Sequence, residues 1–477
     1  MQKRKTRIFV YAQICYVLVI WSALQLFPGA EAFSTMLALI GAWLIIAYTY
    51  KKCEHRNLTG WWTLLITTTV LSIGIIANVH HFTTISGGTT ALPVLNNPDA
   101  HRYYCDALAS ANLPGGIPAP SNQRGYGFII SCIWQLTGVT IVAPLILNMI
   151  LILFCIIISG IISKRIISTH RNHSPSWVAT CAMIMTASIC YYITSGTILL
   201  KEASLCFGIA LCALALSSIL KKDYTHISKC DFFYFILGII ILATIRYTFI
   251  LFIIVAIILA SNKNTFRKRI VAQLILLAIC ICSLLITSYY LSSIAHNALD
   301  KTAEIINGNE AAYFFFSSKY HYAYDQVFGD YFSYPTWKRI LCLPISAITQ
   351  FLIPFPWNFG RDAIYGYTLD YAHIAYPWYL IGGLILYFIL FAWENASSEI
   401  KRITLIGIIL WLIPAYLFAG TVSRYALPFI PLLIPAAVCV WDKYLNKKSF
   451  RIWAYIYCCL LIFTLIICYY LQQSEIQ

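Results

Sequence analysis

Long runs of apolar residues separated by short polar segments dominate this sequence from end to end. A helix needs about 20 apolar residues to cross the hydrocarbon core of a bilayer, and most of the runs approach that length. The pattern therefore predicts an all-α polytopic membrane protein with about 13 transmembrane helices. The expected spans are 8–27, 33–50, 58–79, 139–163, 177–196, 199–220, 232–246, 247–261, 270–291, 378–394, 403–420, 425–441 and 452–471.

Two further apolar runs, 126–138 and 340–354, are predicted not to cross the membrane. In each region, charge assigns the flanking loops to sides of the membrane. Those assignments require one crossing fewer than the number of apolar runs between the loops. We expect 126–138 to form an interfacial or partly inserted helix. We expect 340–354 to enter the bilayer and return to the same side.

Charged residues are few, and their placement follows a topological rule. Only 11% of the chain is charged and 60% is hydrophobic, whereas a soluble protein carries about 25% charge. The net charge of +15 comes from short basic loops, which mark the cytoplasmic side and give no reason to expect nucleic-acid binding. The rule places the N-terminus in the cytoplasm and the C-terminus outside. The basic loops are 3–7, 51–56, 164–171, 221–229, 263–269, 401–402 and 443–451.

The chain is expected to form one integral-membrane domain over 1–477, without a sequence repeat or a soluble domain. Its 17 cysteines are scattered, mostly within apolar runs, and lack metal-ligand spacing, so they are expected to act as small apolar residues. The predicted regions are the first three spans (1–79), a first outer loop with an interfacial helix (80–138), central spans (139–291), a second outer loop with a re-entrant segment (292–377) and C-terminal spans (378–477).

The first outer loop contains the densest group of candidate functional residues. Pro98 suits the first turn of a short helix, where the helix dipole favours an ionised Asp99. Tyr103 follows Asp99 by four residues, so the two positions share one helical face. A helix cap or a pair with Arg102 would also explain Asp99, and a structural salt bridge would explain Asp106. The candidates in this loop are Asp99, Arg102, Tyr103, Asp106 and Arg124.

Three cationic residues, Lys201, Arg246 and Arg424, are expected at the outer ends of spans, against the charge rule. A charge in hydrocarbon costs roughly 2.5–3.5 kcal/mol even on the lenient insertion scale, so such residues usually pair or bind something. An arginine fork matches phosphate oxygens. Two simpler explanations stay open: Lys201 pairs with Glu202, or the arginines are snorkelling anchors.

With these residues the chain resembles the GT-C type of integral-membrane glycosyltransferases, which includes protein O-mannosyltransferases and lipid A aminoarabinose transferases. The resemblance covers about 90–435, although Ala100 stands where the family usually has a second acidic residue. It rests on the Asp-x-x-x-Tyr-x-x-x-Ala pattern of Asp99, Tyr103 and Ala107, on 125–138 with Leu147 and Asn148, on Gly196 to Glu202, on Pro354 to Trp357, and on Gly420, Thr421, Arg424 and Pro428.

The resemblance implies a reaction. Asp99 would be the general base that accepts a proton from the acceptor hydroxyl, and the sugar would transfer with inversion from a polyprenyl-phosphate donor. The acceptor would be a glycan, a lipid or a protein outside the cytoplasm, and no cofactor or metal is implied. The proline–tryptophan pattern resembles bacterial members and so implies the cytoplasmic (inner) membrane. The residues expected to bind substrate are Arg246, Arg424, Lys201, Arg102, Tyr103, Asp106, Arg124 and Trp357.

Two other functions fit the same polar residues. An O-antigen or capsule polymerase would also place arginines against lipid-linked glycans, but it would transfer a whole glycan from a lipid diphosphate. A transporter or flippase of lipid-linked glycans would be expected to show internal repeats and helices broken at the bilayer centre. A purely structural membrane subunit would leave the one-sided gathering of Asp99, Arg246 and Arg424 unexplained.

Overall fold

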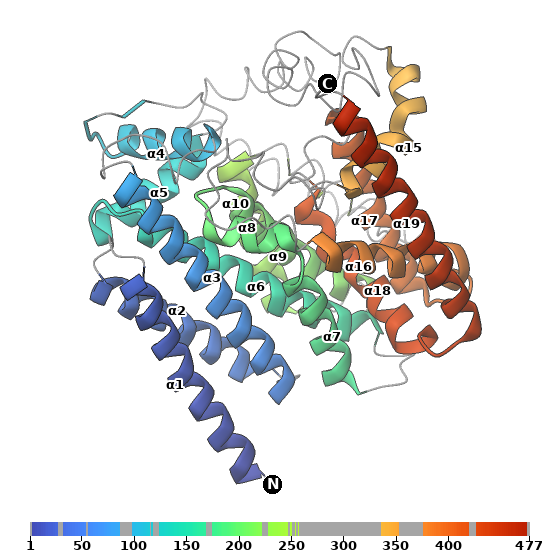
Figure 1. Ribbon diagram of the computed structural model, residues 1–477, viewed down its shortest axis with the longest axis horizontal. Coiled ribbons are helices and arrows are strands. Elements are labelled where there is room, and N and C mark those ends of the chain that lie inside the picture. The colour runs from blue at the N-terminus through green and yellow to red at the C-terminus, as the bar shows by residue number, and fades with distance from the viewer. Residues whose placement is uncertain are drawn as a thin grey trace.

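A computed structural model describes the chain over a set of ranges that contains most of the predicted spans. Within these ranges every regular element is a helix (Figure 1). The expected span 270–291, Trp357 and Arg424 lie outside the described residues. The described ranges are 2–26, 32–53, 56–85, 98–114, 116–117, 124–167, 174–221, 228–246, 335–352, 375–418 and 426–474, together with Phe249, Ile253 and Ala256.

Six helices in the described part of the chain are long and apolar enough to cross a membrane. This finding supports a multi-pass membrane protein and an all-helical fold, as the hydropathy pattern predicts. The total of 13 crossings stays a prediction. The six candidate spans are Phe33–Lys52, Leu58–His80, Val142–Ile167, Glu202–Leu220, Leu427–Tyr444 and Lys448–Ile467.

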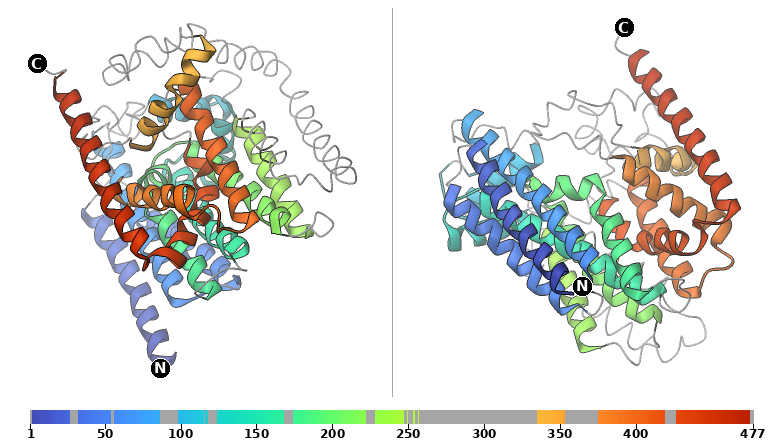
Figure 2. Two further views of the ribbon diagram at one scale, coloured as in Figure 1. Left: turned by 90° about the vertical axis from the view of Figure 1, so that its right-hand side faces the viewer. Right: turned by 60° about the horizontal axis from the view of Figure 1, so that its bottom comes forward.

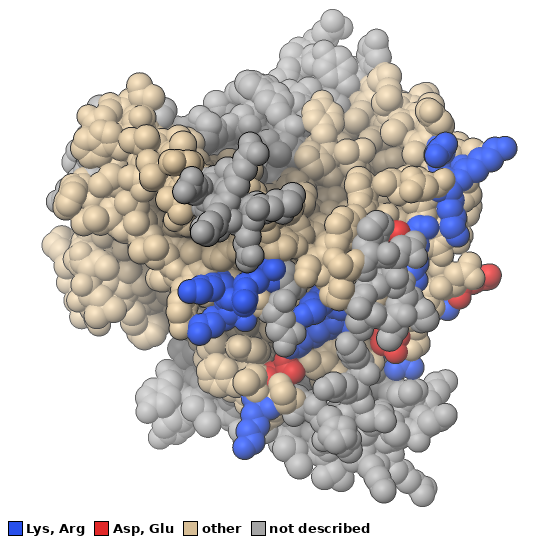
Figure 3. Space-filling model, turned by 90° about the horizontal axis from the view of Figure 1, so that it is seen from below, with Lys and Arg blue, Asp and Glu red and all other residues tan. Residues whose placement is uncertain are grey.

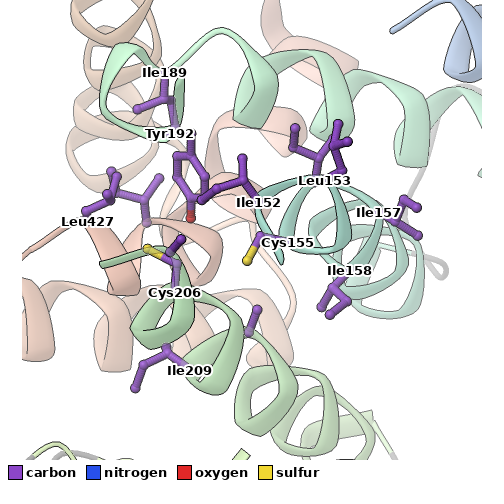
Figure 4. Close-up of a cluster of buried hydrophobic side chains, with 14 of the residues drawn as sticks. Ile152, Leu153, Cys155, Ile157, Ile158, Ile189, Tyr192, Cys206, Ile209 and Leu427 are labelled. Carbon is purple, nitrogen blue, oxygen red and sulfur yellow. The ribbon is translucent and has the colours of Figure 1, made fainter. Parts of the chain in front are cut away.

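Helix α6 lies at the centre of the N-terminal half and packs against most of its neighbours. Buried side chains from α6, α8 and α9 meet there, among them Ile152, Tyr192 and Cys206 (Figure 4). The elements of this half are α1 (Gln2–Leu26), α2 (Ala32–Lys52), α3 (Leu58–Ile85), α4 (Pro98–Ser110), α5 (Arg124–Thr137), α6 (Val142–Ile167), α7 (Pro175–Ala187), α8 (Cys190–Thr197), α9 (Glu202–Lys221) and α10 (Lys229–Arg246).

The expected span 177–196 is not one continuous helix, because the chain forms α7 and α8 there with a break between them. The break is at Ser188, whose hydroxyl donates to the carbonyl of Met185 at 2.8 Å while its backbone N–H bonds back to Ile184 at 3.0 Å. A serine that bonds to nearby backbone competes with continuation of the helix. The sequence 177–196 contains no charged residue, so hydropathy alone does not reveal the interruption.

The ends of α6, α9 and α10 that border predicted cytoplasmic loops lie together. Arg165 near the end of α6 forms an ion pair with Asp231 in the first turn of α10, with 2.9 Å between Nη1 and Oδ1. Ser218 near the end of α9 donates to the other carboxylate oxygen of Asp231 at 2.9 Å. Lysine and arginine side chains gather on the lower face of the molecule (Figure 3). We call this end of the bundle, at Arg165 and Asp231, the basic end.

The C-terminal half is built around α18, which is buried and packs on α16, α17, α6 and α7. Helix α19 lies at the outside of the bundle (Figure 2), and most of its apolar side chains are exposed, as expected of a helix that faces lipid. The elements are α15 (Thr336–Leu352), α16 (Ala375–Tyr387) with its π-helical extension η7 (Phe388–Ala392), α17 (Ser398–Phe418), the short 3₁₀ turn η9 (Leu427–Phe429), α18 (Ile430–Tyr444) and α19 (Lys448–Ser474).

Candidate functional site

Helices α4 and α5 pack on each other at the end of the bundle opposite the basic end (Figure 1). Two aromatic pairs join them edge to face: Tyr103 with Tyr126, whose ring centroids are 5.2 Å apart, and Tyr104 with Trp134, at 5.4 Å. The sequence predicted a short helix from Pro98, and α4 begins there. The position of Asp99 in α4 is therefore one turn before Tyr103.

Two glycines allow α5 to come close to its neighbours. A Cβ on Gly125 would overlap the carbonyl oxygen of Thr244 in α10, and a Cβ on Gly127 would overlap the carboxylate of Asp106. Asp106 is only 1% exposed. Because Thr244 is two residues before Arg246, these contacts bring the end of α10 that carries Arg246 to the start of α5.

Lys201 and Glu202 are both buried where α9 begins. The Lys201 carbonyl accepts the Leu205 backbone N–H at 3.0 Å, so Lys201 stands just before the first residue of the helix. Its Nζ lies 5.1 Å from the centroid of the Tyr103 ring, within the range of a cation–π contact. Glu202 occupies the first turn of α9, at the positive end of the helix dipole.

A hydrogen-bond network around one buried side-chain amide adjoins these residues. Asn148 of α6 is fully buried; its Nδ2 donates to the carbonyl of Ile198 at 2.9 Å and to that of Leu200 at 3.1 Å. The Tyr126 hydroxyl donates to Oδ1 of Asn148 at 3.0 Å. Burial raises the pKa of the Tyr126 phenol above its usual value, so the hydroxyl stays protonated and remains a donor at neutral pH.

The structure brings several of the predicted site residues to one end of the bundle. Tyr103, Asp106 and Lys201 lie there with their side chains, and Arg246 lies at the end of α10 that α5 contacts. Arg102 is partly exposed on α4. Asp99 and Arg124 are placed by their backbone only, in the first turns of α4 and α5.

Sequence reasoning missed two polar residues of this region as site members, Tyr126 and Asn148. An amide inside the most apolar span of the chain, 142–167, is the signal that could have found Asn148. A buried polar group without a partner is costly, so such an amide marks a place where a backbone or another side chain must bond to it.

A narrow apolar cavity of about 20 Å³ lies farther along α9. This volume is far below the roughly 300–1,000 Å³ of ligand pockets. One face of α9 forms a wall of the cavity, and α10, α17 and α18 supply the others. Six of the lining residues are Ile209, Ala213, Leu216, Phe235, Leu410 and Leu432.

Within the described ranges, no group of three or more His, Cys, Asp and Glu side chains is placed to hold a metal ion. Comparisons of the chain with protein-family models, with curated proteins and with solved structures found no match.

Proposed function

We propose that this chain is a membrane glycosyltransferase that moves a sugar from a polyprenyl-phosphate donor to a glycan, lipid or protein acceptor on the extracytoplasmic face. One observation carries the proposal: the buried Lys201 lies over the ring of Tyr103, which follows Asp99 by one turn of α4. The same end of the bundle carries Arg246, where α10 contacts α5. Cations gathered beside a carboxylate suit the transfer of a group from an anionic phosphate.

In this proposal each group has one task. The carboxylate of Asp99 accepts the proton of the acceptor hydroxyl as that oxygen attacks the anomeric carbon. The bond to the lipid phosphate breaks with inversion at carbon, and the leaving phosphate gains negative charge. Lys201 and Arg246 stabilise this charge, because fixed cations aimed at developing charge lower the barrier.

The test is transfer from a radiolabelled polyprenyl-phosphate sugar by the full chain in detergent or liposomes, with Asp99→Asn as the variant. Loss of a general base lowers turnover by roughly 10²–10⁴-fold. Glu394→Gln, which removes an exposed carboxylate beyond α16 and η7, is the matched control and should leave transfer unchanged. Near-normal turnover by Asp99→Asn would remove Asp99 from the role of base.

The same assay separates the competing functions. A polymerase would consume a diphosphate-linked glycan and leave the monophosphate sugar untouched. A flippase would move the labelled lipid across the liposome membrane without breaking its phosphate–sugar bond. Either result would replace the transferase proposal.

A further inference from the structure

The segment between α8 and α9 has an irregular backbone, although it lies inside the bundle. Its residues 198–201 are buried, as is Thr197 at the end of α8, and side chains supply bonds that a continuous helix would make by itself. Asn78 of α3 donates to the carbonyl of Thr197 at 2.8 Å, and Asn148 donates to the carbonyls of Ile198 and Leu200. Non-helical backbone within a membrane bundle persists only where such partners satisfy it.

Contacts from Asn148 run in two directions to the same lysine. Through the backbone, the amide fixes the Leu200 carbonyl, which belongs to the residue directly before Lys201. Through side chains, Asn148 accepts from Tyr126, the Tyr126 ring packs on Tyr103, and the Lys201 ammonium lies over the Tyr103 ring. One buried amide is therefore bonded to the backbone directly before Lys201. Through Tyr126, the same amide also supports the Tyr103 ring over which the Lys201 ammonium lies.

We infer that Asn148, supported by Tyr126, is a positioning residue that holds Lys201 in a buried, preorganised place at the start of α9. Asn148 does not touch the substrate in this inference. It removes the conformational freedom of the 198–201 segment, so the ammonium needs no rearrangement to meet an anion. The placement of Lys201 rests on contacts within the chain, whereas its effect on a phosphate-bearing donor rests on the proposed function.

The chain itself offers a control for general packing. Asn57, at the opposite end of the bundle, donates through Nδ2 to the Ser176 carbonyl at 3.0 Å and to the Thr180 hydroxyl at 2.6 Å. It joins the start of α3 to α7 with two donated amide bonds, as many as Asn148 donates, although one of its two acceptors is a hydroxyl. If Asn148 only stabilised helix packing, Asn57→Leu and Asn148→Leu would have similar consequences for Lys201.

The experiment measures how fast Lys201 is acetylated in the full chain in detergent, by peptide mass spectrometry after pulses of acetic anhydride. We expect Asn148→Leu to speed acetylation of Lys201 at least about tenfold, because loss of two buried hydrogen bonds raises the population of locally open states. Tyr126→Phe, which removes one hydroxyl and keeps the ring, should give a smaller increase. Asn57→Leu should leave the Lys201 rate unchanged.

Equal Lys201 rates in folded Asn148→Leu and Asn57→Leu would overturn the inference. If Asn148→Leu does not fold, Tyr126→Phe decides: an unchanged Lys201 rate in that variant refutes the positioning role. Transfer kinetics form a separate arm, in which Tyr126→Phe should raise KM for the phosphate donor more than it lowers kcat. A wild-type chain that transfers no sugar, while Lys201 still responds to Asn148→Leu, would refute the proposed function and leave the positioning role intact.

Discussion

Removal of the Asp231 carboxylate at the basic end tests how far one charge cluster stabilises this bundle. Asp231 is 5% exposed and accepts from the guanidinium of Arg165 at 2.9 Å and from the hydroxyls of Ser218 and Ser228 at 2.9 and 2.7 Å. These partners come from the ends of α6 and α9 and from the loop before α10. The perturbation is Asp231→Ala, which removes the acceptor that these three donors share, while Arg165 keeps its bonds to the Leu214 carbonyl and the Ser218 hydroxyl.

The expected loss in free energy of unfolding follows from how deeply Asp231 and Arg165 are buried. Breaking a fully buried pair by removal of one partner costs about 3–5 kcal/mol. The Arg165 side chain is 29% exposed, so water solvates part of its charge. We therefore expect Asp231→Ala to lower the free energy of unfolding by about 2–3 kcal/mol. Asp231→Asn keeps one acceptor oxygen and should cost about 1–2 kcal/mol.

The effect should depend on pH in a definite direction. Burial by itself would raise the pKa of Asp231, but the hydrogen bonds from Ser228, Ser218 and Arg165 together with the Arg165 charge lower it below its usual value. A carboxyl group with a lowered folded-state pKa stabilises the fold fully above its unfolded pKa of about 4, and loses that contribution as pH falls through the folded value. The difference between wild type and Asp231→Ala should therefore be constant above about pH 5 and shrink below about pH 4.

The assay is reversible unfolding in mixed micelles of mild detergent and dodecyl sulfate, followed by tryptophan fluorescence at several pH values. Glu394→Gln, which removes an exposed carboxylate, is the control and should change stability by less than about 0.5 kcal/mol. A loss below about 1 kcal/mol for Asp231→Ala, or a difference that does not shrink in acid, would refute this account of the cluster.

Two further substitutions test helix contacts. Gly125→Ala should destabilise the fold by about 1–3 kcal/mol, because its new Cβ meets the Thr244 carbonyl, whereas Gly41→Ala, with open space at its Cβ, should cost nothing. Equal unfolding midpoints for the two variants would contradict the close approach of α5 to α10.

Much of the helical framework could be predicted from local pattern. The expected spans 33–50 and 139–163 correspond to α2 and α6, and the helix expected from Pro98 is α4. Apolar runs of membrane length and basic loops are local signals, because each depends on the transfer of nearby residues between water and lipid. The break at Ser188 escaped prediction because a serine in an apolar run is compatible with both a continuous and an interrupted helix.

Some residues of the candidate site could also be predicted from the sequence, and others could not. Asp106 and Lys201 stood out as charged residues near apolar runs, and Tyr103 stood out by its spacing from Asp99. Tyr126 and Asn148 contributed to the family resemblance but were not assigned to the site, because they belong to segments that are otherwise apolar.

The sequence by itself determined the class of protein, the approximate helices and the concentration of positive charge at one end. Only the tertiary structure decided that Tyr126 bonds to Asn148, and that Asn148 holds the backbone beside Lys201. The physical reason is that lipid and the protein interior are both apolar, so a membrane helix carries little amphipathic signal for the face that contacts its neighbours. Contacts between residues more than 20 positions apart in the chain therefore depend on packing, which no local pattern encodes.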